Sequence, residues 1–333
     1  MWVPFIRLRA TWGAWQRFRK TELPEEHLGN RLLYIHQKGE QMNRFFANKV
    51  VLVTGASRGI GRAVALAFAR EGAQLVLAAR SVNRLAQVET EVRALGSQAL
   101  SVPTDMTSPD AVMALVNAAM SRFGRIDVVV NNAGIGKVGG IELATFEDDL
   151  RQTQQASLFG MIHLTQRVLP VLRKQGFGTI VNMSSVMGRK AFARFGSYAI
   201  VMHSVSAFSD SLRQEVAGSG IRVSVIHPAL TATDLLREAE EAEMPPPFRH
   251  MTPLSSDDVA RAVVSAVRRG KRRVVLPGTA SMLLLGEAFS PRIGDLIANA
   301  LTRRPIARLL GMSRGKTYHE TISQPPDRIA HSG

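Results

Sequence analysis

The chain has 333 residues, of which 45% are apolar, and its 42 basic and 27 acidic side chains leave a net charge of +15. This composition excludes a largely disordered chain, and the absence of cysteine excludes disulfides, thiolate catalysis and cysteine-ligated zinc. No uninterrupted apolar stretch reaches the roughly eighteen residues that a conventional membrane-spanning helix requires.

The first segment, residues 1–47, is predicted to be a basic aromatic extension. All three tryptophans, Trp2, Trp12 and Trp15, lie in the first fifteen residues. Phe5, Leu8, Trp12 and Trp15 recur at helical spacing, and arginines lie elsewhere on the helix. One interpretation is an amphipathic helix that contacts a membrane peripherally through residues 1–20. The alternatives are a helix packed on its own domain or on a sister subunit, and an arginine-rich transit peptide.

Between residues 48 and 277, short β-branched runs alternate with amphipathic helical stretches. This alternation predicts one Rossmann-type, doubly wound α/β domain, with a seven-stranded parallel sheet and helices on both faces. Ligands of such a sheet bind at the carboxyl ends of its strands. The predicted strands are Val50–Val53, Gln74–Ala78, Ala99–Val102, Ile126–Val130, Thr179–Asn182, Val223–Ile226 and Arg273–Leu276.

A glycine-rich loop joins the first predicted strand to the first helix. It reads Thr54-Gly55-Ala56-Ser57-Arg58-Gly59-Ile60-Gly61. Gly55 permits a tight turn, Gly59 lets the backbone approach a pyrophosphate, and Gly61 lets the helix pack closely on the strand. The helix N-terminus then offers free N–H groups to phosphates. The loop therefore predicts a dinucleotide site.

The end of the second predicted strand indicates which dinucleotide is bound. It reads Ala78-Ala79-Arg80-Ser81, where a carboxylate would favour NAD by binding its ribose 2′-hydroxyl. Arg58 and Arg80 instead offer a cationic clamp for a 2′-phosphate, and Ser81 adds a hydroxyl. We therefore expect NADP(H) to be favoured over NAD(H).

Two further motifs follow the fourth and fifth predicted strands. The first is Asn131-Asn132-Ala133-Gly134; the second contains Ser184 and Ser185, with Tyr198 following at the start of a helical segment. With the glycine loop, these motifs resemble the short-chain dehydrogenase/reductase family over residues 48–277. The Ser185–Tyr198 spacing matches that family, which selects Ser185 over Ser184.

The resemblance implies roles for individual residues. Ser185 would hydrogen-bond the substrate oxygen, and Tyr198 would exchange its proton. On the cofactor, Asp105 would meet the adenine ring, Asn132, Ala133 and Gly134 would line the adenine-ribose side, and Pro228, Thr231 and Thr233 would lie near the nicotinamide.

Two family positions are altered. The lysine expected four residues after the tyrosine is Met202, and the asparagine expected on the preceding helix is replaced in a segment that contains Ser157. A lysine there lowers the pKa of the phenol, which methionine does not do. His203 is rotated about 100° off the Tyr198 face of the helix and is disfavoured as a substitute. Arg189, Lys190 and Arg194 remain alternatives for a compensating cation.

The last third contains a predicted substrate lid and a C-terminal extension. The lid covers residues 230–254 and includes several glutamates and three consecutive prolines. Residues 278–313 are predicted to form apolar helices that pack on the domain, contact a membrane or dimerise. Residues 314–333 are predicted to be a flexible tail.

Two functions of different classes follow. The first is an NADP(H)-dependent oxidoreductase acting on a carbonyl/alcohol pair of a small molecule, which we expect to be lipophilic. The alternative is an NADP-binding pseudoenzyme, a sensor or scaffold, because of Met202 and Ser157. A membrane-tethered structural protein without a cofactor is a third hypothesis. We expect a cytoplasmic homo-oligomer, peripheral on a membrane if the N-terminus binds one, with neither a metal site nor nucleic-acid binding.

Overall fold

The computed structural model describes residues 44–233, 248, 251–300, 303 and 305. Apart from Arg44, these residues belong to one compact unit, Phe45–Gly333. Residues 1–43 of the predicted aromatic extension, residues 234–247 and 249–250 of the predicted lid, and the predicted tail lie outside the described residues. Among the described helices, none is long and apolar enough to cross a membrane.

A seven-stranded sheet forms the centre of the unit, in the order β3-β2-β1-β4-β5-β6-β7. All six pairs of neighbouring strands are parallel. The Rossmann-type fold predicted from the sequence is therefore confirmed. The strands are β1 Val50–Thr54, β2 Gln74–Ala79, β3 Ala99–Pro103, β4 Val128–Asn131, β5 Gly178–Met183, β6 Ile221–Pro228 and β7 Arg273–Leu276.

The fourth strand starts two residues later than its predicted start at Ile126. The backbone N–H of Ile126 donates to Oε1 of Gln175 (3.1 Å), and Nε2 of Gln175 donates to the Ile126 carbonyl (2.8 Å). The side-chain amide of Gln175 thus satisfies both backbone hydrogen-bonding groups of Ile126. The ladder between β1 and β4 begins only with the pair Val51–Val128.

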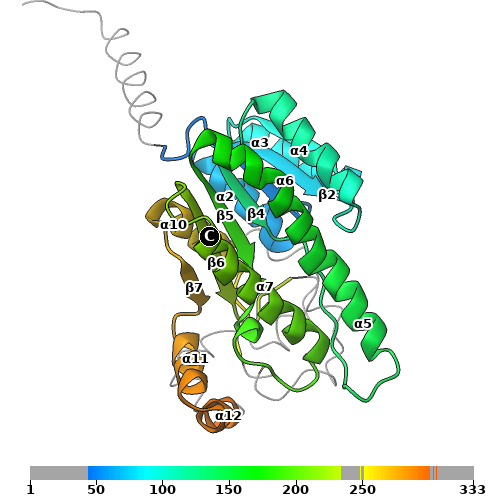
Figure 1. Cartoon of the computed structure of the whole chain (residues 1–333), viewed down its shortest axis with the longest axis vertical. Coiled ribbons are helices and arrows are strands. Elements are labelled where there is room, and N and C mark those ends of the chain that lie inside the picture. Colours follow the sequence, from blue (N-terminus) through cyan, green and yellow to red (C-terminus); the bar gives the residue numbers. More distant parts are fainter. Residues whose placement is uncertain (1–43, 234–247, 249–250, 301–302, 304, 306–333) are drawn as a thin grey trace, which may run out of the picture. The chain divides into compact units, whose positions relative to one another are not determined.

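Helices cover both faces of the sheet (Figure 1). Alternate strand residues point to opposite sides, so Val51 and Val53 join a core with α2, α3 and α10, whereas Val50 and Leu52 join a second core with α4, α6 and α7. The helices are α2 Gly59–Arg70, α3 Val82–Ala94, α4 Pro109–Phe123, α5 Phe146–Thr153, α6 Gly160–Gln175, α7 Gly196–Glu215 and α10 Ser256–Arg269. Both faces are buried, which explains the almost uniformly apolar strands.

Three further segments complete the unit. A π-helical turn, Gln154–Phe159, joins α5 directly to α6, and a short 3-10 turn, Val186–Gly188, follows β5. After β7 come two helices, α11 Ala280–Phe289 and α12 Pro291–Ala300. Both helices lie within the predicted C-terminal extension, residues 278–313, of which residues 301–302, 304 and 306–313 lie outside the described residues (Figure 1).

Candidate functional site

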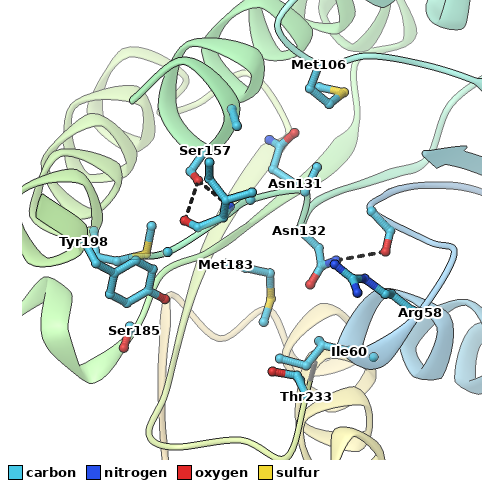
Figure 2. Close-up of a pocket in the computed structure, with 18 of the residues that line it drawn as sticks. Arg58, Ile60, Met106, Asn131, Asn132, Ser157, Met183, Ser185, Tyr198 and Thr233 are labelled. Carbon is cyan, nitrogen blue, oxygen red and sulfur yellow. Dashed lines mark hydrogen bonds between the residues drawn. The ribbon is translucent and has the colours of Figure 1, made fainter. Parts of the chain in front are cut away.

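One large cavity of about 1260 Å³ opens at the carboxyl ends of the central strands. Figure 2 shows Arg58 and Asn132 at one end of it, and Tyr198 and Ser185 at the other. Of the predicted site residues, only Thr54 and Gly61 do not line the cavity. The predicted residues that line the cavity are Gly55, Ser57, Arg58, Gly59, Ile60, Arg80, Ser81, Asp105, Asn132, Ala133, Gly134, Ser157, Ser185, Tyr198, Met202, Pro228, Thr231 and Thr233.

The glycine loop has the backbone shape that its sequence suggests. Gly55 (φ 65°) and Gly59 (φ 53°) adopt left-handed conformations that favour glycine, and α2 begins at Gly59. A Cβ on Gly61 would overlap the Gly55 carbonyl. These features leave an open cradle at the N-terminus of α2, which fits the pyrophosphate of a dinucleotide.

Thr54 and Asn132 hold this loop against the end of β4. The Thr54 hydroxyl accepts from the backbone N–H groups of Asn132 and Ala133, both at 3.0 Å. Nδ2 of Asn132 donates to the Thr54 carbonyl, also at 3.0 Å. The first asparagine of the motif, Asn131, is buried and donates to Oδ1 of Asn182 on β5 (2.8 Å). The motif therefore joins β1, β4 and β5 where the cavity begins.

Three arginines line the cofactor half of the cavity: Arg58, Arg80 and Arg84. Arg84 was not identified from the sequence, although its place in the first turn of the helix after β2 is a usable signal. Asp105 accepts from the backbone N–H and the hydroxyl of Thr107, both at 2.9 Å. These bonds lower the pKa of Asp105, and the charge of Arg80 adds a smaller effect in the same direction.

At the other end of the cavity, the two serines after β5 do different things. The Ser184 hydroxyl donates to the Met202 carbonyl (3.0 Å) and is buried against α7. The Ser185 hydroxyl accepts from the backbone N–H of Met187 (3.2 Å), donates to the Pro228 carbonyl (3.3 Å) and lies beside the Tyr198 phenol (Figure 2). The serine that contacts the phenol is the one selected from the sequence.

Tyr198 lies in the first turn of α7 among apolar side chains. Burial raises the pKa of its phenol to about 12, and the nearby Ser185 hydroxyl opposes this only in part. Met202, one turn further along, is 4% exposed and packs in a cluster with Met161, Val205 and the Tyr198 ring. The position of the family lysine is thus filled by a close-packed apolar side chain, and the phenol is neutral at physiological pH.

Ser157 lies in the π-helical turn, close to the backbone that follows the Asn-Asn-Ala-Gly motif. Its hydroxyl accepts from the Ile135 N–H (3.0 Å) and donates to the Ile135 carbonyl (3.2 Å). A Cβ on Gly134 would come within 2.9 Å of the Ser157 oxygen. Ser157, at the altered asparagine position, therefore uses its hydroxyl both as acceptor and as donor to hold the backbone of this loop in place.

His227, the last residue before Pro228, is a buried group whose importance the sequence did not reveal. Its Nδ1–H donates to the Ser185 carbonyl (2.9 Å), and the ring is 1% exposed. Burial lowers the pKa of His227 to about 4; the nearby charges of Arg189 and Arg273 lower it further, and the bond to Ser185 opposes the shift. The neutral ring supports the backbone of Ser185.

Lys190 does not fold over the phenol, which corrects one alternative for a compensating cation. Its Nζ lies 2.8 Å from Oε2 of Glu287 on α11 and 2.6 Å from Oδ1 of Asp295 on α12. Both carboxylates raise the pKa of Lys190 against the opposing effect of burial. Its charge is therefore neutralised at the C-terminal extension. His203 is exposed and hydrogen-bonds to the Ala199 carbonyl of its own helix.

Comparison with known proteins identifies the class. The family model described as short chain dehydrogenase matches residues 49–244. An uncharacterized oxidoreductase of Staphylococcus saprophyticus is 35% identical over 225 residues, covering 66% of this chain and 90% of that protein. A ketoacyl reductase of Nostoc is 34% identical over 259 residues, covering 75% and 88%.

Solved structures agree. A short chain dehydrogenase/reductase from Burkholderia phymatum in complex with NAD has a TM-score of 0.66 at 26% identity, covering 74% of this chain and 95% of that one. A 7α-hydroxysteroid dehydrogenase complexed with NADH and 7-oxo glycochenodeoxycholic acid has a TM-score of 0.65 at 27% identity, covering 71% and 95%. The chain belongs to the short-chain dehydrogenase/reductase family and is of that family's oxidoreductase type.

Proposed function

We propose that the chain is an NADP(H)-dependent reductase of a lipophilic carbonyl compound. The observation that carries this proposal is the position of Ser185 and Tyr198, which lie beside each other in the same cavity as the glycine loop (Figure 2). A hydroxyl pair at one end and a phosphate cradle at the other match the two parts of a nicotinamide-dependent carbonyl reduction.

The preference for NADP(H) is supported by the cations of the cofactor half. Arg58, Arg80 and Arg84 line the cavity beside Ser81, and β2 ends without the acidic residue that would bind a ribose 2′-hydroxyl. Guanidinium groups bind phosphate oxygens in bidentate fashion. A 2′-phosphate would therefore gain charge-assisted hydrogen bonds that the 2′-hydroxyl of NAD does not make.

The chemistry then divides between cofactor and chain. When bound, the reduced cofactor supplies hydride to the carbonyl carbon. Ser185 hydrogen-bonds the carbonyl oxygen, and Tyr198 donates its phenolic proton to that oxygen, which yields the alcohol. The proposed direction is reduction because the buried phenol, with a pKa of about 12, holds its proton and is a poor base for alcohol oxidation.

The proposed substrate class rests on the wall beside Tyr198. Val186, Met187, Phe195 and Leu230 line this part of the cavity and belong to one buried apolar cluster, which continues into Phe248. Burial of apolar ligand surface against this wall favours binding. The additional polar groups of a polar ketone would lose their hydrogen bonds to water there and find no replacement. A cyclic or long-chain apolar ketone fits this wall better than a small polar one.

A second candidate function is a pseudoenzyme that binds NADP(H) without turnover. The observation that favours it is Met202, which is 4% exposed and packs on the Tyr198 ring where the family places a lysine. In this case the cofactor half acts as a sensor, and the neutral phenol is a packing group.

The test has two parts. Calorimetric titration with NADPH and NADH measures cofactor binding, and we expect NADPH to bind at least tenfold more tightly. The loss of NADPH absorbance is then followed with a series of ketones of rising apolarity. Reduction of the apolar members supports the reductase. Tight NADPH binding without turnover of any ketone favours the pseudoenzyme, and binding of neither nucleotide contradicts both candidates.

A further inference from the structure

The α11–α12 hairpin carries a concentrated apolar surface. Five of the thirteen large apolar side chains that are exposed among the described residues lie within these two helices. They are Met282 (60% exposed), Leu285 (64%), Phe289 (83%), Ile293 (42%) and Leu296 (69%). Single exposed apolar residues need no explanation, but a contiguous group of this kind marks an interaction surface.

The spacing of these residues places them on one side of each helix. Met282, Leu285 and Phe289 are three and four residues apart on α11, and Ile293 and Leu296 are three apart on α12. The opposite side is packed, since Leu283 and Ala298 are buried. Each helix thus has a buried inner side and an exposed apolar side, and the two exposed sides are called the outer face.

Two glycines and one ion cluster hold these two helices in place. Gly286 lies against Ile293 and Ile297, and a Cβ on Gly294 would overlap the Glu287 carboxylate, so the helices pack closely. Lys190, which is 8% exposed, binds Glu287 and Asp295 together. Because this lysine belongs to the loop between Ser185 and Tyr198, the hairpin is held against the substrate side of the cavity. Its outer face is therefore a fixed surface.

The charge around this face indicates its partner. Arg292 is exposed between Phe289 and Ile293. Arg303, just after α12, is exposed as well. A second copy of the chain would bring two such pairs of arginines together, whereas anionic lipid headgroups would neutralise them. Apolar side chains flanked by cations are the pattern of helices that lie in a bilayer interface.

We propose that the outer face of α11–α12 docks on an anionic lipid bilayer, with Leu285 and Phe289 entering the boundary between headgroups and acyl chains. This surface includes neither residues 1–20 nor the cofactor half of the cavity. It would hold the apolar wall of the substrate region close to lipid, where an apolar ketone is concentrated. The docking itself does not depend on the proposed reductase activity.

The test is co-sedimentation of the full chain with vesicles of phosphatidylcholine, with and without phosphatidylglycerol. The double variant Leu285→Ser/Phe289→Ser removes two exposed apolar groups from the hairpin. The matched control, Val82→Ser/Met113→Ser, removes two exposed apolar groups from α3 and α4. We expect binding to the anionic vesicles to fall at least tenfold in the hairpin variant and to be unchanged in the control, with phosphatidylcholine alone binding more weakly.

Far-ultraviolet circular dichroism of the same proteins shows whether each variant is folded. Calorimetric NADPH binding tests the proposed function separately, so a failure of either proposal is distinguishable from a failure of the other. Three outcomes would overturn the proposal. In the first, the full chain does not bind anionic vesicles. In the second, the hairpin variant binds them as tightly as the unaltered chain, which assigns binding to another segment. In the third, the hairpin variant converts a dimer to a monomer in sedimentation velocity without losing vesicle binding, which makes a second copy the partner.

Discussion

The two ends of the cavity are built on different principles. At the cofactor end, the essential features are backbone ones: left-handed Gly55 and Gly59, the start of α2, and the bonds that tie Thr54 to Asn132. At the other end, the Ser185–Tyr198 pair is present, but the group one turn along α7 is Met202, packed in an apolar cluster. Nucleotide binding and proton transfer therefore have separate physical supports and can change independently.

The two altered positions also differ from each other. Ser157 preserves a polar function, since its hydroxyl holds both backbone groups of Ile135. Met202 fills the space of the family's lysine with an apolar side chain that only packs against its neighbours. It supplies no charge, so the phenol stays neutral. One substitution maintains the shape of the site, and the other changes its electrostatics. Variants at each end of the cavity test this separation.

The largest effect is expected from Tyr198→Phe. This change removes the proposed proton donor and keeps the ring that packs on Met202, so ketone reduction should fall by roughly 10²- to 10⁴-fold. NADPH binding, measured by calorimetry on the same sample, should be unchanged. An equal loss of cofactor binding would show that the two ends are not separable, and unchanged turnover would remove Tyr198 from the mechanism.

The next effect concerns stability at acidic pH and His227. Its pKa of about 4 in the folded chain lies below the unfolded value of about 6.5. Its contribution to the free energy of unfolding is therefore complete above pH 6.5 and is lost as the pH falls toward 4, by about 3 kcal/mol. Urea unfolding from pH 7 to pH 4 measures this loss.

His227→Gln should lack this part of the pH dependence, while the exposed control His203→Gln should retain it. If all three proteins lose stability in parallel below pH 6.5, the destabilisation comes from other groups and His227 is not the acid-sensitive support of Ser185.

A smaller effect is expected from Met202→Lys, which would restore a cation beside the phenol. The pKa of Tyr198 should fall from about 12 by roughly two units, so that alcohol oxidation at neutral pH rises about 100-fold. The chain has only three tyrosines, which makes an ultraviolet titration of the phenols readable.

Met202→Leu is the matched control, since it keeps an apolar side chain of similar size. It should leave both the titration and the rates unchanged. A Met202→Lys protein that binds NADPH, but in which the pKa of Tyr198 remains at its original high value, would contradict the role assigned to the missing lysine.

The smallest effect is expected at the cofactor end. Arg80→Ala removes one of three arginines, so the NADPH dissociation constant should rise about tenfold and that of NADH should not change. Arg93→Ala, at an exposed arginine on α3 that pairs with Glu89, is the control and should affect neither nucleotide. If Arg80→Ala weakens the binding of NADPH and NADH equally, then Arg80 contacts a part of the dinucleotide that is common to both.

The sheet, the glycine loop and the family could be predicted from the residues alone, because each is a local pattern. Strand alternation, positive-φ glycines and the spacing of Ser185 and Tyr198 depend on residues that are close along the chain. One turn of helix separates Tyr198 from Met202, so the local spacing also identifies the vacant lysine position.

The surroundings of these residues, in contrast, could not be predicted before the packed fold was known. Lys190 finds Glu287 and Asp295 about a hundred residues away, His227 supports Ser185 from the neighbouring strand, and the outer face of α11–α12 is exposed because its inner face is anchored. Such pairings depend on how distant segments pack, which periodicity and spacing do not encode. Burial then sets the pKa values of Tyr198 and His227, because desolvation is a property of the packed site and not of the residue type.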